Sequence, residues 1–138
     1  MPQTALREDA LTAAPAGFEL RVGLPWIRSM PLSCLAGLAV AVDGVPLEAA
    51  GLTVVLGARN VPADSLRAES GWWFVQDRLV LAGRRELRGG VHAVAVDFQL
   101  LVPYLQAGPG WPLVLPIRLE SWLDLDRAPV SSVSRDVA

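Results

Sequence analysis

The side chains that commonly carry proton transfer and metal binding are scarce in this sequence of 138 residues, which has one histidine and one cysteine. The single cysteine, Cys34, excludes an internal disulfide and fits a reducing compartment. With His92 as the only histidine, a metal site of the usual histidine and cysteine stoichiometry cannot be assembled. A Ser-His-Asp triad would have to use His92, and no Gly-x-Ser-x-Gly segment is present to expose a serine.

A strong net charge and long apolar runs are absent as well. The net charge is −2, and the twelve basic residues are scattered arginines, which excludes the basic patch typical of nucleic-acid-binding proteins. No stretch approaches the roughly 20 apolar residues of a membrane-spanning helix. The N-terminal region carries Glu8 and Asp9 and lacks the apolar run of a signal peptide. We therefore predict a soluble, cytoplasmic protein that binds neither nucleic acid nor membrane.

Hydrophobic residues, by contrast, make up 52% of the chain, and many alternate with polar or small residues at a period of two. The clearest alternation lies in residues 91–102, where one face carries Val94, Val96, Phe98, Leu100 and Val102. The same pattern occurs in residues 17–24, 38–44, 52–57, 72–81 and 112–125. This period is typical of half-buried strands, and glycine and proline clusters separate them. The sequence therefore predicts an all-β fold, an antiparallel β-sandwich with at most one short helix, at residues 62–70.

The chain length fits one domain with a core of its own. We assign the β-sandwich domain to residues 17–126. Residues 1–16 are predicted to be a flexible N-terminal segment, and residues 127–138 a flexible C-terminal tail.

Two local signals refine the predicted strands. The Asp43-Gly44 pair indicates a tight turn after the strand at residues 38–42. Pro112 and Pro116 lack the backbone N–H that a central strand needs. The last strand is therefore predicted to lie at a sheet edge or to be bent.

The few polar residues that stand out are better explained by structure than by catalysis. We place His92 at the start of its strand, on the face opposite Val94, as a surface or satisfied structural residue. Cys34 is interpreted as a small buried hydrophobe and not as a nucleophile. Asp124 and Asp126 would face the same side of a strand and could hold a cation, although a solvated edge is the favoured interpretation. We therefore predict no catalytic and no metal-binding residue in this chain.

Five tryptophans are the most informative residues, because several lie in proline-rich connections. The segment LPWIRSMPLSC (24–34) is apolar, yet its two prolines disfavour a helix or a central strand. Large apolar side chains left exposed indicate a partner, and Trp, Tyr and Arg dominate the energetics of protein interfaces. The predicted partner interface consists of Pro25, Trp26, Arg28, Met30, Pro31, Leu32, Tyr104 and Trp111. The alternative is that this loop only covers one end of the sandwich.

Three segments occur in a recognisable order: LRVGLPWIRSMPLSCLAGLAVAVDGVPL, then GWWFVQDRLVL, then VHAVAVDFQLLVPYL after a glycine pair. Together they resemble the β subunit of bacterial C-glycoside deglycosidases, over about residues 17–125. The resemblance implies a small β-sandwich that assembles with a larger α subunit, a TIM barrel similar to sugar isomerases that carries a divalent metal, usually manganese. No cofactor is expected in this chain.

The resemblance also implies a reaction. The complex would act on a 3-oxo-C-glucoside with a flavonoid-type aglycone, and would break the carbon–carbon glycosidic bond by elimination. The catalytic base and the metal ligands would belong to the α subunit, so this chain would be the non-catalytic partner in a carbon–carbon lyase. Trp72 and Trp73 are adjacent, point to opposite faces of a strand, and are our candidates for an aglycone pocket.

Two other hypotheses stay open at the level of sequence. The chain could be a self-contained carbohydrate- or flavonoid-binding module that uses exposed tryptophans as stacking surfaces. It could also be a small enzyme that uses His92 with an aspartate. The first predicts a well-behaved monomer that binds such ligands, and the second predicts activity in the purified chain alone.

Overall fold

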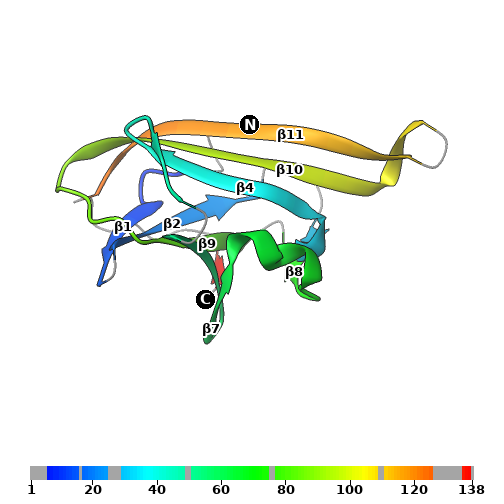
Figure 1. The fold of residues 1–138 in the computed structure, drawn as a ribbon, viewed down its shortest axis with the longest axis horizontal. Coiled ribbons are helices and arrows are strands. Elements are labelled where there is room, and N and C mark those ends of the chain that lie inside the picture. The colour runs from blue at the N-terminus through cyan, green and yellow to red at the C-terminus, as the bar shows by residue number, and fades with distance from the viewer. Residues whose placement is uncertain are drawn as a thin grey trace.

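The computed structural model describes residues 6–15, 17–24, 29–48, 51–74, 77–108, 111–125 and 135–137. Two sheets face each other, and the layer formed by β4, β10 and β11 lies over the layer formed by β1, β2 and β9 (Figure 1). The first sheet has the order β1-β2-β9-β6-β7 and the second has the order β11-β10-β4-β5. The prediction of an all-β fold with antiparallel sheets is confirmed.

The bounds of the elements follow the chain. The strands of the first sheet are β1 (Leu11–Ala14), β2 (Gly17–Gly23), β6 (Leu52–Leu56), β7 (Arg59–Pro62), β9 (Asp77–Gly83) and the parallel strand β12 (Arg135–Val137), which pairs with β9. The strands of the second sheet are β4 (Leu35–Val42), β5 (Val45–Pro46), β10 (Val91–Gly108) and β11 (Trp111–Asp124). A two-stranded sheet joins β3 (Met30–Pro31) to β8 (Trp72–Trp73), and the 3-10 helices are η2 (Leu32–Cys34) and η4 (Ala63–Ala68).

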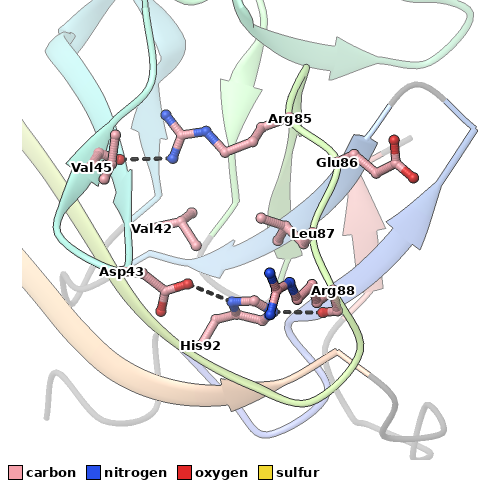
Figure 2. A pocket seen from close by; sticks show the side chains of 8 residues that line it. All are labelled: Val42, Asp43, Val45, Arg85, Glu86, Leu87, Arg88 and His92. Atoms are coloured by element: carbon pink, nitrogen blue, oxygen red, sulfur yellow. Dashed lines mark hydrogen bonds and ion pairs between the residues drawn. The ribbon is translucent and has the colours of Figure 1, made fainter.

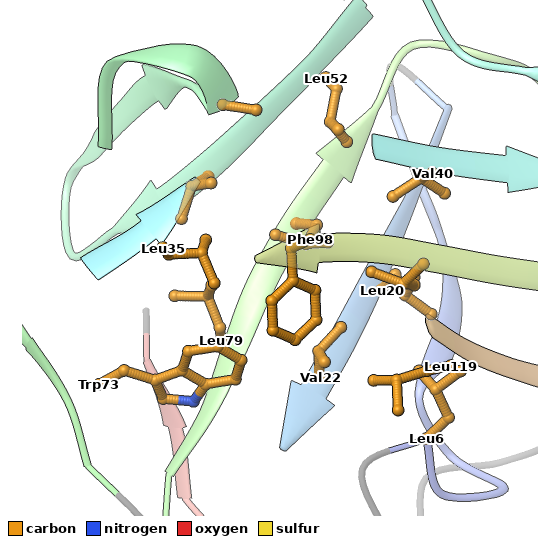
Figure 3. Packing of buried hydrophobic residues seen from close by; sticks show 14 of the residues in the cluster. Leu6, Leu20, Val22, Leu35, Val40, Leu52, Trp73, Leu79, Phe98 and Leu119 are labelled. Carbon is orange, nitrogen blue, oxygen red and sulfur yellow. The ribbon is translucent and has the colours of Figure 1, made fainter. Parts of the chain in front are cut away.

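The core lies between the two sheets and consists of the alternating residues that the sequence indicates. Strand β2 contributes Phe18, Leu20 and Val22, and β10 contributes five inward residues from Val94 to Val102, all of them buried. Figure 3 shows the rings of Trp73 and Phe98 directed toward each other, and their centroids are 6.0 Å apart at an interplanar angle of 50°. Burying one such large apolar side chain contributes roughly 1.5–3 kcal/mol to folding.

Strand β4 departs from strict alternation at one place. Asp97 pairs with Ala39 and Gln99 pairs with Ala36, so two residues of β4 stand opposite one residue of β10. Gly37, in this interval, has a φ of 65°, which glycine adopts without strain. This is a β-bulge, and it explains why Leu38, the first residue of the alternation predicted for 38–44, is only half-buried.

The signals for the turn and for the sheet edge are both confirmed. Asp43 and Gly44 have φ values of 54° and 81°, the positive pair that a two-residue hairpin of type I′ requires. Strand β11 lies at the edge of its sheet, which is where prolines at 112 and 116 are tolerated.

Several boundary predictions need correction. Residues 11–14, assigned to a flexible N-terminal segment, form β1, and residues 135–137 of the predicted tail form β12. The predicted strand at 72–81 is divided into β8 and β9. The predicted helix at 62–70 is the 3-10 helix η4, in which Leu66 is buried as an anchor. Among the described residues no helix is long and apolar enough to cross a membrane.

A buried ion pair fastens the N-terminal segment to the first sheet. The Nη1 atom of Arg78 lies 2.9 Å from Oδ1 of Asp9, and both side chains are buried. Next to it, the backbone N–H of Arg21 donates to the carbonyl of Ala10 over 2.8 Å. The sequence does not reveal this contact, because 69 residues separate Asp9 from Arg78.

Candidate partner-binding surface

The small β3–β8 sheet positions the Trp-Trp-Phe segment at one end of the sandwich. Met30 pairs with Trp73 and Pro31 with Trp72, and the N–H of Leu32 donates to the carbonyl of Gly71 over 2.9 Å. Because adjacent strand residues alternate between faces, the two tryptophans separate completely. Trp73 is 1% exposed and Trp72 is 50% exposed.

Trp73 is therefore a core residue, and its assignment to an aglycone pocket is wrong. Its indole packs near Phe98, and its Nε1 donates to the carbonyl of Asp77 over 3.3 Å. This bond joins β8 to the start of β9 across residues 75–76. Trp72 remains on the surface and stays a candidate.

Two of the apolar residues predicted for the partner interface are buried instead. Met30 and Leu32 are buried in the core of the chain itself, so their side chains do not face a partner. The pairing of β3 with β8 turns them inward, and this pairing joins segments about 40 residues apart. Pro31 is half-buried.

The side chains of the other five predicted interface residues lie outside the described part of the structure. Pro25, Trp26 and Arg28 lie outside the described residues. Tyr104 and Trp111 lie on β10 and β11, whose backbone is described there. Figure 1 shows this end of the long β10–β11 ribbon on the same side of the molecule as β8.

Two exposed aromatic residues mark this end. Phe74, 45% exposed, follows β8 and is two positions from Trp72. Phe74 is not among the interface or pocket residues predicted from the sequence, although its spacing of two from Trp72 indicates that the two side chains share a face. We name Trp72 and Phe74 the aromatic end patch.

A second exposed tryptophan lies on the outer face of the four-stranded sheet. Trp122, 74% exposed, pairs across strands with Ala93 and borders a shallow groove of about 530 Å³ whose other lining residues include Ala41 and Ala95. In the same groove, Arg118 Nη1 contacts Asp97 Oδ2 at 2.6 Å, and this hydrogen bond raises the pKa of Arg118. This outer groove is the second candidate surface.

Both ring nitrogens of His92 are engaged by groups of the chain itself. Its Nδ1 is 2.7 Å from Asp43 Oδ2 and its Nε2 is 2.7 Å from the carbonyl oxygen of Arg88 (Figure 2). The ring is buried on the same face as Val94, so its predicted placement on the opposite face is wrong; residues two apart on a strand share a face. The hydrogen bond from His92, and then that from the Ala93 amide, holds the pKa of Asp43 below its usual value.

The other chemical candidates give no site among the residues that are described. Cys34 is half-buried against the core, as a small hydrophobe would be. Within the described ranges, no group of three or more His, Cys, Asp or Glu side chains could hold a metal ion. Asp126, one half of the proposed aspartate pair, lies outside these ranges.

Comparison with known proteins then decides the family. Residues 2–104 match the family model described as C-glycoside deglycosidase beta subunit. The chain belongs to this family. A 3'-dehydrocarminate deglycosidase beta subunit from a Microbacterium species is 32% identical over 108 residues, which cover 77% of this chain and 81% of that protein.

Two further relatives are named C-glycoside deglycosidase beta subunit. The protein from Microbacterium trichothecenolyticum is 34% identical over 75% of this chain and 76% of its own length. The protein from Arthrobacter globiformis is 37% identical over 62% of this chain and 68% of its own length. The chain is thus a deglycosidase beta subunit by family, and the term subunit implies a partner chain. The matched region includes the aromatic end patch and His92, and it ends within β10.

Proposed function

We propose that this beta subunit is the non-catalytic partner of a larger α subunit in a C-glycoside deglycosidase. Family membership carries the proposal. The only histidine supports it, because both of its ring nitrogens are engaged by acceptors of the chain itself. A histidine held in this way is not oriented to remove a proton from a substrate.

The substrate class that we propose is a 3-oxo-C-glucoside with a flavonoid-type or similar aromatic aglycone. The ketone at C3 acidifies the proton on C2, so a base can remove it and leave an enolate. Expulsion of the aglycone from C1 then forms the C1–C2 double bond, and the aglycone carbon takes up a proton. We assign the base and a divalent metal, manganese in our proposal, to a sugar-isomerase-like TIM-barrel α subunit.

Reconstitution tests this assignment of roles. We expect the purified beta subunit alone and the α subunit alone to release little or no aglycone from 3'-dehydrocarminate or a 3-oxo-C-glucoside, and the co-expressed complex to release it rapidly. The variant His92→Gln should retain turnover in the complex, because the ring serves the beta subunit's own structure. Cleavage by the isolated beta subunit would overturn the proposal.

The aromatic end patch is the part of the described surface that we propose for the α subunit. It adjoins β3, where Pro31 pairs with Trp72, and large aromatic residues commonly carry interface affinity. Truncating Trp72 and Phe74 together to alanine should weaken subunit affinity about 30-fold or more, since such interface residues contribute at least about 2 kcal/mol.

Trp122→Ala is the matched control, because it removes an exposed tryptophan from the outer groove. Affinity can be measured by isothermal titration or by analytical ultracentrifugation of the two subunits. Dissociation caused by Trp122→Ala, with the patch variant still bound tightly, would place the interface on the outer sheet face.

A further inference from the structure

The hydrogen bonds of His92 specify its charge. Two acceptor atoms of the described residues lie at the ring nitrogens, the carboxylate oxygen Oδ2 of Asp43 and the backbone carbonyl oxygen of Arg88, each at 2.7 Å (Figure 2). A backbone carbonyl can only accept a hydrogen bond. The other oxygen of Asp43, Oδ1, already accepts the N–H of Ala93 over 3.0 Å, as expected for an ionised carboxylate.

A neutral imidazole cannot satisfy both neighbours. It carries one N–H, so one of its nitrogens would present a lone pair to the lone pair of an oxygen only 2.7 Å away. The imidazolium ion carries two N–H groups and donates to both oxygens. Asp43 supplies the opposite charge, because its pKa is held below the usual value by His92 and Ala93.

We propose that His92 is held as the imidazolium cation and acts as a pH-sensitive latch between the β4–β5 turn and segment 84–90. The turn contributes Asp43, and the segment contributes the Arg88 carbonyl. Leu87, in the middle of this segment, is partly buried against the core. The latch therefore keeps in place a residue that covers the core.

Other groups around the latch define its electrostatic setting. Arg85 donates to the carbonyls of Val45 and Pro46 over 2.8 Å each, which is a second attachment that does not titrate near neutrality. Arg85 also lowers the pKa of Asp43 through its charge. The lining of this pocket, about 400 Å³ in volume, adds Glu86 and Arg88, and Asp124 lies on β11 beside the residue that pairs with His92.

The direction of the pH dependence follows from these contacts. The charged ring bonds to both partners in the folded chain, so the latch contributes stability at pH values below its titration. As the pH rises through that titration, one of the two bonds must be lost, and the link between the β4–β5 turn and segment 84–90 then depends on the remaining bond and on Arg85. The latch requires no partner subunit, so this inference stands or fails independently of the proposed function.

The single histidine makes the test direct. In the full chain, labelled with ring-¹⁵N histidine and studied free or bound to an unlabelled partner, every ring signal belongs to His92. We expect both ring nitrogens to be protonated at pH 7, where about three quarters of free histidine side chains are neutral. Asp43→Asn should lower the titration midpoint by about one pH unit or more and should accelerate amide exchange at Ala93.

Asp97→Asn is the matched control, because Asp97 is also a partly exposed aspartate of the second sheet but pairs with Arg118. It should leave the His92 titration unchanged. A single protonated ring nitrogen at pH 7 in the unmodified chain would overturn the proposal, and this measurement decides even if Asp43→Asn does not fold. An unchanged midpoint in a folded Asp43→Asn variant would overturn it as well.

Discussion

Replacing Trp73 with alanine should lower the free energy of unfolding by about 3–5 kcal/mol, the usual cost of truncating a fully buried tryptophan. The same change at Trp72, one residue away, should alter it by no more than about 0.5 kcal/mol, as for most surface substitutions. The difference arises because Trp73 fills the core beside Phe98 and also donates a hydrogen bond to the start of β9.

Urea unfolding followed by far-ultraviolet circular dichroism measures both losses without depending on tryptophan emission. If Trp73→Ala does not fold, Trp73→Phe gives a milder truncation that should still be more damaging than Trp72→Phe. Equal losses at the two positions would contradict the assignment of opposite faces. The comparison also shows whether a weaker subunit contact in a Trp72 variant arises at the surface or from a loosened fold.

Replacing Arg78 with methionine should cost about 3–5 kcal/mol of unfolding free energy, because it leaves the buried Asp9 carboxylate without its cation. Removing both charges, with Asp9→Leu and Arg78→Met together, should recover most of that loss. A buried pair of apolar side chains of similar volume is often as stable as a buried ion pair.

The four corners of this double-mutant cycle can be measured by the same denaturation experiment. Arg118→Met is the control, since Arg118 forms a short but exposed ion pair with Asp97 and its loss should matter far less. A double variant as unstable as Arg78→Met alone would show that Arg78 acts through packing and not through its charge.

How far the sequence predicts this fold depends on how local the determining contacts are. The alternation in β2 and β10, the turn at Asp43-Gly44 and the edge position of β11 follow from neighbouring residues alone, and all are confirmed. Strand β1 was missed because LTAA carries a weak pattern and is fixed by pairing with β2 and by distant Arg78. The bulge at Gly37 was missed because it depends on the register with β10.

The candidate surface shows the same limit. The prolines at 25 and 31 predict that no central strand runs through this segment, and Pro31 lies in the two-stranded β3–β8 sheet, but the burial of Met30 and Leu32 comes from β8, some 40 residues along the chain. An exposed loop and a loop folded back on the core have the same composition. Phe74, in contrast, could have been selected from its spacing with Trp72. The family was correctly identified from the order of the motifs, which local contacts do not determine.

The prolines of β11 restrict how another molecule can approach that border of the molecule. Without N–H groups at 112 and 116, the rim cannot present an uninterrupted row of donors to an incoming strand. Recognition there must be read through side-chain shape and charge, and not through extension of the backbone ladder. The same interruption should hinder edge-to-edge pairing between newly synthesised chains before they bind a partner subunit.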